Sequence, residues 1–126
     1  YFRDFAYCDS GMVPWLIVAE LVSKSGRALG DWVGDRFVAF PSSGEINFRV
    51  ADAGSAIERV LAAHRPAALS VDEADGVSLT FQDWRFNLRR SNTEPLVRLN
   101  VEGRGGAASL AAKVEAIAVL LGGTRT

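Results

Sequence analysis

The stretch "WRFNLRRSNTEPLVRLNVE", residues 84–102, encodes two amphipathic strands joined by a polar loop. Apolar residues alternate with polar ones on both sides of the loop, at Trp84, Phe86, Leu88, Val97, Leu99 and Val101. This period of two is typical of a strand that turns one face to a core and the other to solvent. The segment "SNTEP" joins the two strands. The pattern therefore places Arg89 and Arg98 on the polar faces, flanking the loop.

The segments before and after this stretch predict the rest of one domain. "EINFRV" (45–50) alternates in the same way, and "ALSVDEADGVSLTF" (68–81) has the pattern of a hairpin that turns at Asp75 and Gly76. A helix is predicted from Asp52 or Ser55 to just before Pro66, and another from about residue 107 to the glycines at 122–123. The order strand, helix, four strands, helix predicts an α+β domain with two helices on one face of a mainly antiparallel sheet.

Residues 1 to about 40 show a different pattern. A helix is predicted in "DSGMVPWLIVAELVSKSG" (9–26), capped by Asp9 or Ser10, and a shorter one over about 28–37. The first helix is apolar nearly all round, so it needs cover on several sides, which residues 1–25 cannot supply. We expect a domain boundary in the Pro/Ser/Gly cluster near residues 41–44, with a piece of a preceding domain before it.

The composition excludes several classes of protein. The chain has 126 residues, 48% of them hydrophobic, which suits a globular protein. Its 14 basic and 15 acidic residues give a net charge of −1, so no global field attracts nucleic acid or an acidic membrane surface. A single cysteine and a single histidine provide no internal disulfide and no zinc ligand set, and the apolar runs are too short to span a membrane.

The polar loop and its flanking arginines predict an anion site. Arg89 and Arg98 supply forked guanidiniums, Ser91 and Thr93 supply hydroxyls, and Asn92 supplies an amide, while a tight turn directs backbone N–H groups inward. A phosphate dianion can use this many donors.

Two alternatives compete with the anion site. The arginines could only solvate a sheet face. "SNTE" also fits a helix capping box, although Pro95 lies too far into the first turn for that role. Glu94 disfavours anion binding unless its carboxylate points away from the loop.

The segment "RRSNTEPLVR" resembles the phosphate-binding loop, R-x-S-N-T-E-P-x-x-R, of the last domain of the phosphohexomutases, the phosphoglucomutase/phosphomannomutase enzymes. The resemblance covers the whole chain: "FPSSGEINFRV" (40–50) resembles the hinge and first strand of that domain. It implies that residues 1–41 are the end of domain 3 and residues 42–126 are domain 4, of the TBP-like class of antiparallel sheet.

The resemblance implies a function and its residues. Domain 4 of such an enzyme holds the non-reacting phosphate of a phosphohexose while a phosphoserine in domain 1 transfers phosphate at the other end of the sugar. The clamp then consists of Arg89, Ser91, Asn92, Thr93 and Arg98. The phosphoserine, the aspartates that bind Mg²⁺ and the sugar-selecting loop of the parent enzyme lie outside this sequence, so we expect no catalytic residue and no metal ligand here. The implied partners are a phosphosugar and the other domains of a cytoplasmic enzyme of carbohydrate metabolism, without nucleic acid or membrane.

Other functions remain open at this point. One alternative is a free-standing phosphate- or nucleotide-binding module whose likeness is confined to the loop. Another is a scaffold domain without a ligand. Preference for glucose or mannose cannot be predicted, because the selecting loop is absent.

Overall fold

The computed structural model describes residues 2–104 and 106–126, which divide into two compact units between Arg36 and Phe37. The first unit contains a 3-10 turn, η1 (Arg3–Phe5), α1 (Met12–Ser25) and most of α2 (Leu29–Ala39). The second contains β1 (Ser42–Arg49), α3 (Ala53–His64), η2 (Arg65–Ala67), β2 (Ser70–Asp72), β3 (Val77–Thr80), β4 (Trp84–Arg90), β5 (Leu96–Gly103), α4 (Gly106–Leu121) and β6 (Thr124–Arg125). The assignment of these parts to two domains of a larger enzyme stays a prediction.

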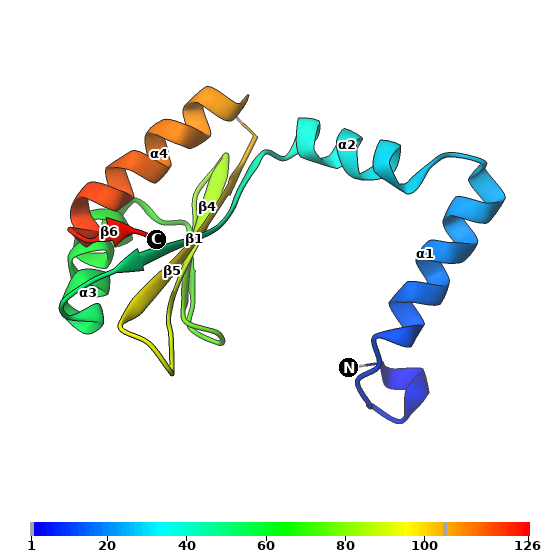
Figure 1. The fold of residues 1–126 in the computed structure, drawn as a ribbon, viewed down its shortest axis with the longest axis horizontal. Coiled ribbons are helices and arrows are strands. Elements are labelled where there is room, and N and C mark those ends of the chain that lie inside the picture. The colour runs from blue at the N-terminus through cyan, green and yellow to red at the C-terminus, as the bar shows by residue number, and fades with distance from the viewer. Residues whose placement is uncertain (1, 105) are drawn as a thin grey trace. The chain divides into compact units, whose positions relative to one another are not determined.

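The second unit is built on one six-stranded sheet in the order β2-β3-β4-β5-β1-β6, with every pair antiparallel. Strands β2 to β5 form a meander in chain order. Strand β1 lies between β5 and β6, so the strand that begins the unit joins the sheet next to the two that end it (Figure 1). The two-residue strand β6 was not predicted.

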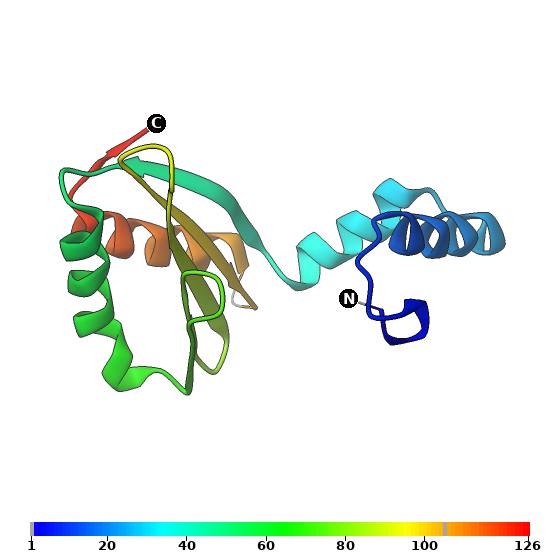
Figure 2. The same cartoon turned by 90° about the horizontal axis from the view of Figure 1, so that it is seen from below.

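Helices α3 and α4 lie on the same face of this sheet and contact each other (Figure 2). Apolar side chains of four strands pack against them, and the largest fully buried ones include Phe48, Phe86, Leu79, Leu88, Leu99 and Ile117. The alternating positions of β1, β3, β4 and β5 are polar and form the other face of the sheet. The predicted α+β class, with two helices on one face of an antiparallel sheet, is confirmed.

Asp52, one of the two predicted starts, is the N-cap of helix α3. The Asp52 side chain accepts hydrogen bonds from the backbone N–H groups of Gly54 (2.9 Å) and Ser55 (3.3 Å), and from the Ser55 hydroxyl (2.6 Å). These bonds, led by that of the Ser55 hydroxyl, lower the pKa of the Asp52 carboxyl. The helix buries Ala56, Val60 and Leu61 in the core.

The end of α4 is held by the neighbouring helix. The Arg59 guanidinium donates to the carbonyls of Leu120 and Leu121, each at 3.0 Å. The last carbonyls of a helix have no partner within the helix, so Arg59 satisfies two of them and joins α3 to α4. Gly122 then turns the chain with φ at +66°. Gly123 allows the chain to pass close to Arg49, because a Cβ there would lie 2.5 Å from the Arg49 carbonyl oxygen.

The first unit differs from the second in burial. None of the described residues up to Ala39 is buried. Helix α1 stops at Gly26, the end of its predicted range, and Gly26 is a C-cap in the left-handed conformation. Its N-cap is Gly11 and makes no side-chain capping bond, so the expected cap at Asp9 or Ser10 is wrong. No helix in the described part of the chain has the length and apolar character needed to span a membrane.

Candidate functional site

Arg89 and Arg98 are direct cross-strand neighbours on the polar face of the sheet. The register of β4 and β5 pairs Arg89 with Arg98, and that of β5 and β1 pairs Arg98 with Asn47. Because cross-strand neighbours on one face have Cβ atoms only about 4.5–5.5 Å apart, the two guanidiniums emerge close together. The prediction that both arginines lie on the polar face is confirmed.

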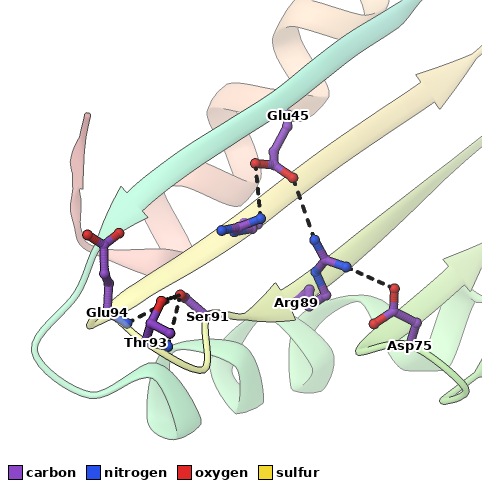
Figure 3. Close-up of polar contacts among 7 residues, drawn as sticks. Glu45, Asp75, Arg89, Ser91, Thr93 and Glu94 are labelled. Carbon is purple, nitrogen blue, oxygen red and sulfur yellow. Dashed lines mark hydrogen bonds and ion pairs between the residues drawn. The ribbon is translucent and has the colours of Figure 1, made fainter.

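One carboxylate, that of Glu45 on β1, reaches both arginines. Its Oε1 lies 3.5 Å from Nη1 of Arg98, and its Oε2 lies 3.8 Å from Nη2 of Arg89. Arg89 also pairs with Asp75, whose Oδ2 is 3.1 Å from Nη1 (Figure 3). Two positive charges thus face two negative charges, and one of those carboxylates bridges the arginine pair.

The turn at Gly76 fixes the position of Asp75. Gly76 has φ at +71°, and a Cβ there would lie 2.4 Å from the carbonyl oxygen of Leu88 and 3.0 Å from the Cα of Arg89. Only glycine permits this close approach. The turn between β2 and β3 therefore packs directly on β4 and brings the Asp75 carboxylate to Arg89.

Arg98 keeps unused donor capacity. Its Nε is buried and has no acceptor within the described part of the chain. The Oδ1 of Asn47, the neighbour of Arg98 on β1, is also buried and receives no hydrogen bond from the described residues. About a third of the Arg98 side chain is exposed, at 34%. Buried polar groups are rarely unpaired, so this end of the site has hydrogen-bonding groups to spare.

The loop between β4 and β5 is ordered by Ser91. The buried Ser91 hydroxyl accepts from the backbone N–H groups of Thr93 (3.4 Å) and Glu94 (3.3 Å), and contacts the Thr93 hydroxyl at 3.4 Å. The Ser91 N–H donates to the Leu96 carbonyl at 2.9 Å, which closes the loop. In Figure 3 the Glu94 carboxylate is directed away from the two hydroxyls, the condition under which it does not oppose an anion.

Four of the five predicted site residues thus form two pairs. Arg89 and Arg98 meet through Glu45, and Ser91 and Thr93 meet through their hydroxyls. Asn92 is exposed at the tip of the loop. Ser91 accepts hydrogen bonds from two backbone N–H groups, as a helix cap does. Strand β5 and not a helix follows, so the capping-box alternative is wrong. The assignment of these residues to phosphate binding stays a prediction.

Sequence reasoning missed Glu45 and Asp75 as parts of the site. The alternation of residues 45–50 put Glu45 and Asn47 on the polar face, and this was the one signal that could have pointed to Glu45. For metal binding, residues 2–104 and 106–126 contain no group of three or more His, Cys, Asp or Glu residues arranged to hold an ion.

Comparison with known proteins identifies the family. The family described as "Phosphoglucomutase/phosphomannomutase, C-terminal domain" matches residues 45–119, which contain β1 from Glu45, the arginine pair and the loop. The chain belongs to this family. The likeness is not confined to the loop.

Curated relatives match over nearly the whole chain. A phosphomannomutase of Salmonella montevideo is 60% identical over 121 residues, which is 96% of this chain and 26% of the relative. A protein of Xanthomonas campestris pv. campestris (strain B100) named "Phosphohexose mutases" is 58% identical over 123 residues, 98% of this chain and 28% of the relative. The chain thus spans about a quarter of the length of these relatives.

A solved structure is also similar. It is that of a phosphoglucomutase/phosphomannomutase family protein from Burkholderia thailandensis, with a TM-score of 0.49 and 26% identity, covering 67% of this chain and 19% of the other. Family membership rests on the sequence matches above.

Proposed function

We propose that this chain is the C-terminal part of a phosphohexomutase and holds the non-reacting phosphate of a phosphohexose, such as a mannose or glucose phosphate, during intramolecular phosphoryl transfer. The phosphoserine and the Mg²⁺ ion that carry the chemistry belong to other domains of the same cytoplasmic enzyme. The names of the relatives and the share of their length that this chain covers support this placement.

The observation that carries the proposal is the Glu45 carboxylate held between two guanidiniums. It places one oxygen near each arginine, at 3.5 and 3.8 Å, and so stands in for an external anion. A phosphate monoester offers three terminal oxygens and up to two negative charges, and arginine forks match its geometry. The phosphate therefore replaces Glu45 between the arginines.

The loop residues complete the clamp from the side. Ser91 holds the turn, and the Thr93 hydroxyl and the Asn92 amide supply further donors next to the arginines. None of the five residues makes or breaks a bond. Their contribution is orientation and charge balance, which supply much of the rate enhancement in phosphoryl transfer.

A titration with mannose 6-phosphate, followed by amide NMR shifts, tests the clamp. Arg89→Ala and Arg98→Ala each remove charge-assisted hydrogen bonds worth about 1.5–3 kcal/mol, so affinity should fall roughly ten- to hundredfold. Arg98→Lys should recover part of the loss, because a point charge cannot donate two parallel bonds.

Arg85→Ala is the matched control. Arg85 lies on the same face of β4 but pairs with Glu102 at 2.8 Å, away from the loop, so its loss should leave affinity for inorganic phosphate nearly unchanged. Equal binding by wild type, Arg89→Ala and Arg98→Ala would place the phosphate elsewhere.

Glu45→Gln gives the opposite sign of effect. The amide has the shape of the carboxylate but no charge, so it competes less for the arginines, and inorganic phosphate should bind several-fold more tightly. Weaker binding would show that Glu45 orients the arginines for the phosphate rather than occupying its place.

The chain alone should have no mutase activity on glucose 1-phosphate or mannose 1-phosphate, because none of the clamp residues can carry a phosphoryl group. A phosphate- or nucleotide-binding module without catalysis is the competing function. Adenosine 5′-monophosphate that bound far more tightly than mannose 6-phosphate would favour it.

A further inference from the structure

The polar face of the sheet is arranged in rows across the strands, and the row next to the arginine pair is formed by uncharged groups and Glu45. The registers align Glu45 with Asn100, Asn100 with Asn87, and Asn87 with Ser78. We name Asn100, Asn87 and Ser78 the amide row. Residues two apart on a strand lie about 6.7 Å apart, so the amide row begins one such step from the arginines.

A cavity of about 290 Å³ lies over this row. It is lined by Ser78, Asn87 and Asn100, and at the far end by Arg85 and Glu102, which pair with each other at 2.8 Å. The volume is close to the lower end of the range for small-molecule sites, and the lining is polar, as a sugar requires.

The amide row has hydrogen-bonding groups that the protein does not use. Asn87 donates its Nδ2 to the Asp75 carbonyl (2.9 Å) and to the Ser78 hydroxyl (3.0 Å), which fixes the amide and leaves its Oδ1 as an acceptor. The Asn100 side chain makes no hydrogen bond to any described residue, so its donor and acceptor are both available. One amide can donate to one hydroxyl and accept from its neighbour, which matches the paired hydroxyls of a pyranose.

We infer that the amide row binds hydroxyl groups of the hexose whose phosphate Arg89 and Arg98 hold, with Asn100 as the principal contact. The inference rests on the proposed function, since the phosphate fixes where the sugar starts. The ester oxygen directs the ring away from the arginines, and the cavity over the neighbouring row receives it. The ion pair of Arg85 and Glu102 limits how far the ring extends.

The test compares two ligands, inorganic phosphate and mannose 6-phosphate, titrated into the 126-residue chain and followed by amide NMR shifts. Asn100→Ala should lower the affinity for mannose 6-phosphate about three- to tenfold, which is the effect of losing one or two neutral hydrogen bonds. It should change the affinity for inorganic phosphate less than twofold. Asn100→Thr, which suits a strand, provides the same comparison if the alanine variant unfolds. Thr80→Ala, on the same face but outside the cavity, should change neither affinity.

The outcomes separate this inference from the proposed function. Suppose that Arg98→Ala lowers the affinity for both ligands, while Asn100→Ala changes both affinities equally or changes neither. The amide row then does not bind the sugar, and the phosphate clamp stands. If Arg98→Ala changes neither affinity, the clamp itself is wrong, and the sugar site falls with it.

Discussion

The two units of this chain contain similar proportions of apolar residues and use them in opposite ways. In the second unit, apolar residues alternate with polar ones along strands, and the core side chains Phe48, Leu79 and Leu99 are at most 1% exposed. In the first unit, α1 is apolar on nearly every side, and Trp15 and Leu16 are 61% and 56% exposed. A helix without a polar face cannot bury itself against one neighbour, so hydrophobic content alone does not produce a core.

The exposed apolar side chains of α1 affect the behaviour of the isolated chain. Apolar side chains such as Trp15, Leu16 and Ile17 are costly to expose to water, so the first unit requires cover from other segments. The relatives are about four times as long as this chain, and the proposed domain 3 would supply that cover.

Hydrogen exchange should separate the two units most strongly. The buried strand and helix amides within residues 45–121 open with the core, whose stability we take as about 5 kcal/mol or more, so their exchange should be slower than that of residues 2–40 by a factor of at least about 10³. Mass spectrometry or NMR on the monomer measures this. Uniform protection along a monomeric chain would contradict the comparison and indicate an independently complete fold.

Equivalent truncations should have unequal effects. Phe48→Ala removes a side chain that is 1% exposed and should lower the free energy of unfolding by about 3–5 kcal/mol. Leu16→Ala, in a residue 56% exposed, should change it by less than about 0.5 kcal/mol. Urea unfolding followed by circular dichroism provides both values. A comparable loss from Leu16→Ala would show that α1 is packed in solution.

The two helix N-termini should respond differently to pH. The lowered pKa of Asp52 means that its ionised form stabilises the fold. This contribution is complete above the unfolded pKa, near 3.8, and is lost as the pH falls through the folded pKa below that value. Asp52→Ala should therefore be less stable than wild type at neutral pH, and the difference should disappear in acid.

Ser10→Ala is the control for that experiment, because α1 has no side-chain cap. Its thermal midpoint should match that of wild type at every pH. If Asp52→Ala had a thermal midpoint lower than that of wild type by the same amount at every pH, Asp52 would stabilise the helix by something other than its charge.

Local patterns explain what the sequence could predict. The alternation in residues 84–102 predicted β4 and β5, and the pair Asp75–Gly76 predicted a turn in which glycine is required by its positive φ. Two-residue β6 has no periodicity, and it forms because Gly123 lets the chain pass next to Arg49.

The site was less predictable than the fold for a related reason. Whether Glu45 reaches Arg89 and Arg98 depends on the register between β1 and β5, which includes an irregularity between Ser42 and Glu45. Register between strands so distant in sequence is fixed by packing in the finished sheet. The resemblance of the loop identified the arginines, and only the structure showed that a carboxylate lies between them.

The position of β1 between β5 and β6 has a consequence for synthesis of the protein. On the ribosome, β1 is the first strand to emerge, and residues 50–95 must follow before β5 is made. That takes several seconds at about 5–20 residues per second. During that interval the nascent chain exposes Phe48 and Ile46 on an unpaired strand, a surface that chaperones bind. Glu45 and Arg98 come together only after β5 has been made, so their ion pair is among the last contacts of the unit to form.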